Sequence, residues 1–407
     1  MPVDLSAIPK PARRKSPPSV KRWLVYLLGF LVCGGIVTLW LWPETLPVKS
    51  ALFWHCFIII PFVLWGITAV MRWLLWLNFE WFADGWDNER ELDLKNEIER
   101  AQRFIVLNAM SVHLPHVAAS EAISQQFLVP DGVSLPAVVD EKTLSMSHYA
   151  EFNDAGEPLF SARINKWLGI LLADPTIQSG LYICNPECRL KVVIQIANES
   201  QINEVEVAAV KQTVIPLVPS SAIIEIISDY GLSDIDNWLD EPDTFHKLLV
   251  LSINLFDSIS DGEGEVAVGL LFCSADSNYG EPYIARVHRP ECTKEPLSVH
   301  SAARQAMRWG KVSADDVASL WLSGVNSEHN LPALLAVHNL KFPRAEENKQ
   351  LIHIDIKSGT TGLSSPWLAL ALAAGNSESI SFPQLVINMA GPDITPWWFV
   401  VHPYMSP

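Results

Sequence analysis

Two long apolar stretches near the N-terminus constrain this chain more than any other feature. Residues 23–42 read WLVYLLGFLVCGGIVTLWLW and residues 51–71 read ALFWHCFIIIPFVLWGITAVM, neither with a formally charged side chain. At about 1.5 Å per residue, a helix of either length crosses the roughly 30 Å hydrocarbon core of a bilayer. A signal peptide has an apolar region of only about 7–15 residues. The sequence therefore predicts two transmembrane helices, 23–42 and 51–71.

The charges around these stretches predict how they are oriented. The short linker 43–50 makes the two stretches a hairpin, and residues 1–22 form a basic tail with six lysines and arginines against one acid. The linker offers only Lys49. The positive-inside rule then places the N-terminus in the cytoplasm, and an even number of spans returns the chain there. We expect a protein of the bacterial inner membrane whose large C-terminal domain is cytoplasmic.

Tryptophans mark both ends of the hairpin, as in the aromatic belt of a membrane protein. Trp40 and Trp42 stand at one end, and the other end carries Trp73, Trp76, Trp81 and Trp86. We expect Arg72–Trp86 to leave the bilayer along its surface, so that residues 72–102 form an interfacial segment and a charged stalk. His55 has no second ionisable partner in the hairpin. We therefore interpret it as a neutral residue near the outer interface and not as a proton carrier.

The remainder of the chain is acidic. Of the formal net charge of −16, residues 1–78 contribute +6, which leaves −22 on residues 79–407. Phosphate binding needs a basic surface, so we expect no nucleic-acid partner. An anionic leaflet repels such a domain, and we expect its partners to be proteins. Six cysteines in 407 residues do not make a disulfide scaffold.

From residue 104 onward, apolar runs alternate with helical patterns. Nine runs predict strands: Phe104–Ala109, Leu190–Ala197, Ala222–Ile227, Leu248–Leu255, Val266–Cys273, Tyr283–Val287, Leu320–Leu322, Ile352–Ile356 and Leu385–Met389. Six segments predict helices: Ala118–Phe127, Ala162–Leu172, Glu204–Ile215, Val299–Gly310, Leu331–Asn339 and Pro366–Ala374. This alternation indicates an α/β fold with a largely parallel sheet. We expect two halves, 103–260 and 261–407, that join near Ser258–Glu265.

The sequence predicts no metal site and no cofactor. Cys184 and Cys188 form a C-x3-C pair, but a structural zinc site needs a second pair of Cys or His ligands, and none is evident. Four acids lie in one short segment: Asp257, Asp261, Glu263 and Glu265. They lack the alternating spacing of a calcium loop, so we interpret them as a solvated acidic turn. No P-loop, G-x-G-x-x-G, G-x-S-x-G or H-E-x-x-H motif is present.

Three segments of the second half follow one another in a recognisable order. DGEGEVAVGLLF is a glycine-rich turn before a strand, and KVSADDVASLWLSG leads from a helix into a strand. IHIDIKSGTTGLSSPWLALALAAG is a lysine–serine loop that runs into a helix of small residues. Over roughly residues 258–405 this order resembles that of the condensing enzymes. The resemblance implies a thiolase-like fold, with two similar βαβ-rich halves in five layers.

The same resemblance implies catalytic positions, and this chain leaves them empty. Condensing enzymes need a cysteine nucleophile on a helix N-terminus and histidines that polarise the acyl carbonyl. No cysteine lies between Cys188 and Cys273, the turn after LWLSG continues as VN, and Lys357 and Ser358 are followed by GTTG. We therefore expect no catalytic residue and a structural role for Lys357, which would hold loop carbonyls. His329 fills the first histidine role only if the register slips by five residues.

Three further segments are NERELDLKNEIERAQRFIVLNAM, DGEGE and MAGPDITPWWFVVHPY. Together with the order of hairpin, stalk and acidic domain, they resemble the type VI lipase adaptor protein family. That resemblance implies a non-catalytic adaptor that binds a phospholipase effector in the cytoplasm and passes it to the secretion spike. Two other classes stay open: a membrane-tethered acyltransferase that would use Cys273 or Cys292, and a structural subunit of an envelope complex.

Trp397 and Trp398 are the candidate partner-binding residues. As neighbours on an extended segment they point to opposite faces, so one of them can stay exposed. Exposed tryptophan is a common anchor of protein interfaces. We expect the partner to dock through one of them, on the face formed by the loops 323–329 and 358–364 and the turn 392–398. The alternative is that both tryptophans pack on the sheet.

Overall fold

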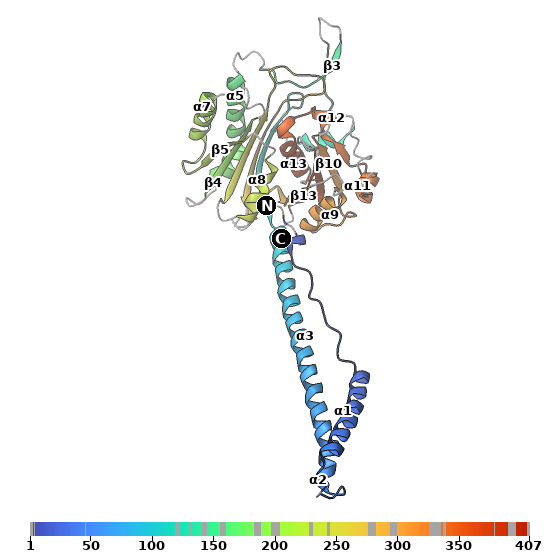
Figure 1. The fold of residues 1–407 in the computed structure, drawn as a ribbon. Helices are drawn as coiled ribbons and strands as arrows, with labels where there is room; N and C mark the ends of the chain where they lie inside the picture. Colours follow the sequence, from blue (N-terminus) through green and yellow to red (C-terminus); the bar gives the residue numbers. More distant parts are fainter. Residues whose placement is uncertain are drawn as a thin grey trace. The chain divides into compact units, whose positions relative to one another are not determined.

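The structure, a computed structural model, forms two compact units (Figure 1). One unit comprises residues 4–97, and the other comprises residues 98–407 together with residues 1–3. The structure describes residues 3, 5–44, 46–118, 123–130, 132–139, 145–154, 160–182, 189–196, 204–227, 231–241, 245–275, 282–293, 299–324, 335–336, 339–377, 379–389 and 396–404.

The first unit is built on a helical hairpin. Its elements, in chain order, are η1 (Leu5–Ala7), α1 (Val20–Leu41), α2 (Ala51–Trp54), a π-helical turn (His55–Ile59) and α3 (Ile60–Ala101), whose last turn belongs to the second unit. The arms pack closely, because a Cβ on Gly34 would lie 2.1 Å from Cγ of Pro61. The indole of Trp65 donates a hydrogen bond to the carbonyl of Trp23 at 2.9 Å. Glycine at position 34 therefore lets the two arms approach.

Both arms are long and apolar enough to cross a membrane. Their most apolar windows have mean hydropathies of 2.3 and 2.0, and 6% of each window is buried inside the protein. These exposed apolar helices are compatible with membrane association. The interfacial segment expected at Arg72–Trp86 is not a separate element, because α3 continues through it to Ala101. The sequence has no proline between Pro61 and Pro115, so no proline interrupts α3 before it ends at Ala101.

The second unit holds one large mixed sheet, and its first five strands form the first half. They are β1 (Phe104–His113), β4 (Leu190–Ile196), β5 (Ile223–Ile227), β6 (Lys247–Asn254) and β7 (Val266–Ser274). They lie side by side in the order β5-β4-β6-β7-β1. β4 is parallel to β5 and β6, whereas β7 is antiparallel to β6 and β1.

The second half repeats this arrangement. Its strands are β8 (Ala285–His288), β10 (Ser319–Ser323), β11 (Leu351–His353), β12 (Gln384–Asn388) and β13 (Trp397–Pro403), in the order β11-β10-β12-β13-β8. In both halves the order is third, second, fourth, fifth, first, and the fifth strand is antiparallel to its neighbours. The halves meet where β1 pairs with β8. The expectation of two similar halves is therefore confirmed.

The boundary between the halves differs from the sequence expectation. Because β7 completes the first half and β8 opens the second, the boundary lies between Ser274 and Ala285, not near Ser258–Glu265. The DGEGE turn links β6 to β7 within one half. The sheet is also mixed and not largely parallel, since the connections from β6 to β7 and from β12 to β13 are too short for a crossover helix.

Helices cover the sheet and fill its centre. They are α4 (Ile123–Leu128), α5 (Phe160–Ala173), α6 (Pro175–Tyr182), α7 (Glu204–Val214), α8 (Leu232–Asp240), α9 (Val299–Trp309), α11 (Pro343–Glu347), α12 (Ile354–Ser358) and α13 (Ser365–Asn376). Shorter elements are β2 (Ala137–Val139), β3 (Met146–His148), β9 (Glu291–Cys292), η4 (Ile215–Leu217) and η7 (Gly362–Ser364). One core lies under α5, α6 and α7, a second lies under α9 and α11, and a third surrounds α13 between the halves (Figure 1).

Each predicted strand is present, although several ends shift, and one run loses three of its five residues. The run Ile352–Ile356 leaves the sheet after His353, because the chain turns into α12 and carries Ile356 to the surface, where it is 61% exposed. The predicted helices are present as well, except that Leu331–Asn339 lies largely outside the described residues. The patterns do not predict α6, α8 or β13.

A buried arginine contradicts the expectation that all four acids of the 257–265 segment are solvated. Arg163 of α5 contacts Asp154 at 3.0 Å and Glu265 at 2.8 Å, and the side chain of Glu265 is 0% exposed. The same carboxylate accepts hydrogen bonds from the amides of Phe152 and Phe256. Glu265 therefore belongs to a buried ion cluster, whereas Asp261 is an exposed residue that caps the amide of His148.

We expect the stability of the second unit to fall as the pH drops from 7 to 5. The rings of His288 on β8 and His402 on β13 lie 4.9 Å apart. Burial lowers the pKa of both imidazoles, that of His288 to about 3, and the neighbouring charges of Arg286 and Lys311 add to the effect on His288. An unfolded histidine has a pKa of about 6.5. The contribution of the two neutral histidines to stability is therefore present above that pH and is lost below it. For His288 the loss is about 2 kcal/mol at pH 5.

His288→Phe tests this pH dependence, because the variant keeps a ring and loses the titrating group. Thermal unfolding of the parent should be measured at pH 7 and pH 5, and the variant should lose clearly less stability over that interval. An equal loss in both proteins would show that another group controls the pH dependence.

Candidate functional site

The helix that precedes β6 is α8, and its N-terminus is where the condensing-enzyme pattern places a cysteine. The described residues at this end are Gly231 and Leu232, and the sequence has no cysteine between Cys188 and Cys273. Gly231 has a φ of 66°, and a Cβ there would lie 2.7 Å from the ring of Trp367. This backbone conformation and this close contact both favour glycine.

The first histidine position follows β10. Ser323 ends that strand, is fully buried and accepts a hydrogen bond from the amide of Asn388 at 2.8 Å. Gly324 comes next, with a φ of 77°. Val325, Asn326 and His329 lie outside the described residues. The role of His329 as a replacement histidine therefore stays a prediction.

Lys357 holds backbone carbonyls, as the sequence predicts. Its ammonium group donates hydrogen bonds to the carbonyls of Phe127 at 2.9 Å and Val129 at 2.5 Å, at the end of α4. The imidazole of His116 contacts the carbonyl of Lys357 at 2.9 Å. The lysine thus joins the chain after α4 to the loop that leads into α13.

The second histidine position falls in the GTTG segment after Ser358. Gly359 has a φ of 78° and Gly362 a φ of 51°. A Cβ on Gly359 would lie 2.5 Å from the carbonyl carbon of Glu263, and one on Gly362 would lie 2.9 Å from Oδ1 of Asn254. An imidazole at Gly359 would require the backbone of Glu263 to shift, and one at Gly362 would require the side chain of Asn254 to move.

Buried hydroxyls and amides occupy the space beside this loop. Ser252 of β6 donates a hydrogen bond to Gln195 of β4 and contacts the hydroxyl of Ser364 at 2.7 Å. Within the described part of the chain, the amide nitrogen of Asn254 and the hydroxyl of Thr361 have no hydrogen-bond partner. Neutral groups of this kind can position a polar ligand, but they do not supply a strong acid or base.

The described residues contain no group of three His, Cys, Asp or Glu side chains placed to hold a metal ion. Cys184 and Cys188 lie outside the described residues. Among the cysteines that the structure describes, Cys273 is buried and Cys292 is partly buried. Neither of these two thiols lies at a helix N-terminus, because both are in strands.

Trp397 and Trp398 lie on opposite faces of β13. Trp398 is 0% exposed, and its indole donates a hydrogen bond to Oγ1 of Thr293 at 3.2 Å. Trp397 is partly buried against the central core. Of the two, Trp397 alone keeps surface that a partner can reach. The binding role of these tryptophans stays a prediction.

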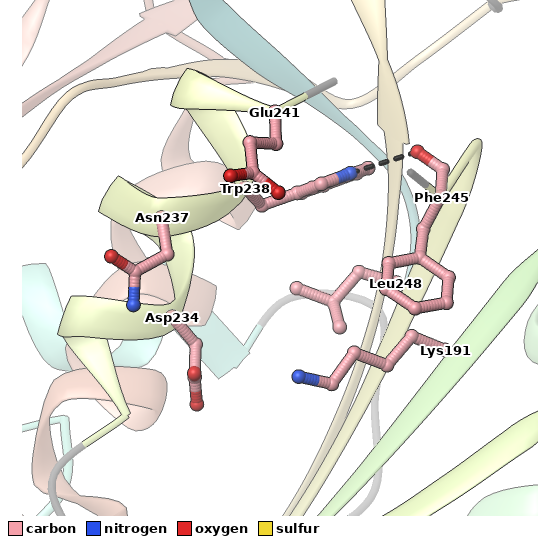
Figure 2. Close-up of a pocket in the computed structure, with 7 residues that line it drawn as sticks. All are labelled: Lys191, Asp234, Asn237, Trp238, Glu241, Phe245 and Leu248. Carbon is pink, nitrogen blue, oxygen red and sulfur yellow. Dashed lines mark hydrogen bonds between the residues drawn. The ribbon is translucent and has the colours of Figure 1, made fainter. Parts of the chain in front are cut away.

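A pocket of about 200 Å³ lies between α8 and the strands β4 and β6 (Figure 2). Its lining comprises Lys191, Asp234, Asn237, Trp238, Glu241, Phe245 and Leu248. The indole of Trp238 donates a hydrogen bond to the carbonyl of Phe245 at 2.8 Å, which fixes an aromatic wall. Lys191 extends toward Asp234 in Figure 2 and pairs with Glu225 at 2.7 Å. The pocket combines an apolar surface with charges of both signs.

Comparison with known proteins identifies the fold. No protein-family model and no curated protein sequence matches the chain. Among solved structures, the oxazolomycin ketosynthase domain OzmH KS7 of Streptomyces albus matches with a TM-score of 0.52 at 11% identity, over 75% of each chain. The ketosynthase–chain length factor PfaC matches with a TM-score of 0.51 at 14% identity, over 75% of this chain and 43% of its own.

The acyltransferase ChlB3 matches with a TM-score of 0.50 at 14% identity, over 74% of this chain and 98% of its own. Identities this low show the fold alone. The duplicated strand order and these similarities define a thiolase-like fold, the fold of condensing enzymes. The chain spans less than half the length of PfaC.

Proposed function

We propose that this protein is a membrane-anchored, non-catalytic adaptor that binds a lipase effector for delivery to the type VI secretion spike. The observation that carries the non-catalytic part is the glycine geometry. Gly231 and Gly359 have positive φ values, and a Cβ at either would lie within 2.7 Å of a neighbouring atom, in the two regions where condensing enzymes carry a thiol and an imidazole. A condensing reaction needs both groups, because a thiolate must attack and an imidazole must polarise the carbonyl.

The anchor part of the proposal rests on the hairpin. Core helices of a soluble protein bury their apolar side chains, but only 6% of each apolar window is buried here. Leu28, Ile36, Leu64 and Ile67 are each at least 50% exposed. Leaving so much apolar surface in water costs about 25 cal/mol per Å², and a bilayer removes that cost.

The adaptor part rests on charge and on the family resemblance. The net charge of −22 over residues 79–407 favours a partner with a basic face and speeds its association. The pocket beside α8 supplies an aromatic wall and two carboxylates, of Asp234 and Glu241, to receive a large side chain of such a partner. The lipase and the spike come from the resemblance to the adaptor family.

A membrane-tethered acyltransferase is the second candidate, because the fold matches that of the acyltransferase ChlB3. Cys273 and Cys292 would be its thiols. Tagged full-length protein, solubilised from its native host, is expected to co-purify with a lipase and to acquire no radiolabel from acyl thioesters. Acyl transfer to Cys273 or Cys292 would contradict the adaptor proposal and support the acyltransferase. Co-purification of envelope proteins without a lipase would instead support a structural subunit.

The orientation of the hairpin is a separate prediction. Six cations before the first span and two spans are expected to leave both ends of the chain in the cytoplasm. Alkaline phosphatase fused after Pro407 should be inactive, and the same enzyme inserted near Glu44 should be active. The opposite pattern of activity would reverse the orientation and would expose Cys184 and Cys188 to an oxidising compartment.

A further inference from the structure

Within the first unit, the segment before α1 lies against α3. Three carbonyls of the tail accept hydrogen bonds from side chains of α3: Pro9 from Arg90 at 2.8 Å, Lys10 from Trp86 at 3.3 Å and Lys15 from Trp76 at 3.0 Å. Residues early in the tail contact residues late in α3, so the tail runs antiparallel to the helix.

Arg14 is the centre of the charged contacts. Its guanidinium group pairs with Glu80 at 2.6 Å, Asp84 at 2.8 Å and Asp87 at 3.0 Å. Asp87 also accepts a hydrogen bond from the backbone amide of Ala12 at 2.8 Å. This amide and then Arg14 lower the pKa of the Asp87 carboxyl. Three carboxylates of one helix thus converge on one arginine of the tail.

Aromatic and small side chains of α3 complete the contact. The ammonium group of Lys15 lies 3.5 Å above the ring of Phe79, a cation–π contact. Ala83 is 5% exposed although it lies in the middle of a long exposed helix. A cavity of about 250 Å³ between the tail and α3 is lined by Ala12, Arg13, Lys15, Phe79, Phe82, Ala83 and Trp86.

These α3 residues form one face of the helix. Positions 76, 79, 80, 83, 86, 87 and 90 follow one another at helical spacing, so their side chains lie in a single row. An aromatic-lined groove is a means by which proteins bind extended proline-containing peptides, and here two indole N–H groups also bond tail carbonyls, those of Lys10 and Lys15. Pro9 and Pro11 restrict the free tail, which lowers the entropy lost on docking.

We infer that residues 76–90 of α3 form a docking stripe for an extended, basic, proline-containing peptide, and that its occupant is the chain's own segment 9–15, bound in cis. The docking stripe binds the peptide by hydrogen bonds to its backbone carbonyls and by ion pairs with one arginine, Arg14. The docked tail is held along α3 and not on an anionic leaflet, although such a leaflet attracts basic segments. The inference does not depend on the proposed adaptor function.

Hydrogen–deuterium exchange of the full-length protein tests the inference. The protein is placed in nanodiscs of phosphatidylcholine, which carries no net charge, and exchange is followed in a peptide that contains residues 12–16. In Arg14→Ala the amide of Ala12, which bonds Asp87 in the parent, is expected to exchange at least about fivefold faster. Arg22→Ala is the matched control, because it removes the same charge from an exposed arginine that lies outside the contact between the tail and α3.

Trp76→Phe separates docking from simple charge attraction. It keeps an aromatic ring and removes the N–H that bonds the Lys15 carbonyl, so it is expected to accelerate exchange in the same peptide. Three outcomes would overturn the inference. They are fast exchange of the parent's tail, equal effects of Arg22→Ala and Arg14→Ala, or protection that appears only when anionic lipid is added. The last outcome would place the tail on the leaflet.

Discussion

Arg163→Met is expected to destabilise the second unit by about 3–5 kcal/mol, because it leaves the buried Glu265 without its cation and Asp154 with only the exposed Lys166. The side chains of Asp154 and Glu265 are 2% and 0% exposed, and that of Arg163 is 6% exposed. Methionine retains most of the apolar stem, so the change removes the charge with little change in packing. Thermal or urea unfolding of the full-length protein measures the effect.

The deficit of Arg163→Met should also depend on pH. Burial raises the pKa of Glu265, and Arg163 opposes that rise. Without the arginine the folded pKa lies further above the unfolded value of about 4.3, so the variant is favoured at low pH and loses stability as the pH rises. The difference from the parent is therefore expected to be larger at pH 8 than at pH 5.

Lys166→Met is the matched control for Arg163→Met. Lys166 lies on the same helix and contacts Asp154 at 3.5 Å, but its side chain is 47% exposed. An exposed ion pair contributes about 0–1 kcal/mol, so this variant should unfold close to the parent. Equal losses in the two variants would show that burial of the ion cluster does not determine its contribution.

The sequence predicts most strands because their apolar runs are local signals. β6 and β7 are apolar along their whole length and are buried at every position. α8 is missed although Leu232, Ile235 and Leu239 follow a helical spacing, since three aspartates interrupt the pattern. Two of these aspartates pair with the buried Arg289, which lies 49 or more residues away. No pattern in the sequence around α8 indicates such a distant partner.

Some features of the candidate site also follow from the sequence, and others do not. The role of Lys357 follows from the lysine–serine loop, because an ammonium group beside loop carbonyls donates to them. The burial of Glu265 does not follow from the sequence, since its partner Arg163 is 102 residues away. The pocket beside α8 is missed together with that helix. A search for apolar residues at three- and four-residue spacing, with acids allowed between them, would have found α8.

The tail shows how a charge pattern can carry two meanings. The cations of residues 1–22 are counted by the positive-inside rule without regard to their position. Glu80, Asp84 and Asp87 also stand at helical spacing in the sequence, which places them on one face. What the sequence lacks is a signal that the tail folds back along α3. The structure joins these two patterns through Arg14.

Trp398→Ala is expected to destabilise the second unit by about 3–5 kcal/mol, through loss of apolar burial and the cavity that remains. Trp398 is fully buried in the core under α9, and the change also leaves Thr293 without its indole partner. Trp397→Ala should cost clearly less, because Trp397 is only partly buried. Thermal unfolding of the two full-length variants measures this difference.

The same pair of variants tests the predicted docking face. If a partner binds there, Trp397→Ala is expected to fold and to bind the co-purifying protein more than about tenfold more weakly, as for an interface anchor worth about 1.4 kcal/mol or more. Weak binding by Trp398→Ala carries no such meaning, because its loss of stability reduces the folded population. Parent-like affinity of a folded Trp397→Ala would exclude Trp397 as the anchor. The pocket lined by Lys191 and Trp238 would then be the next site to test. Trp238→Phe would keep its aromatic wall, and Lys191→Met would remove its cation.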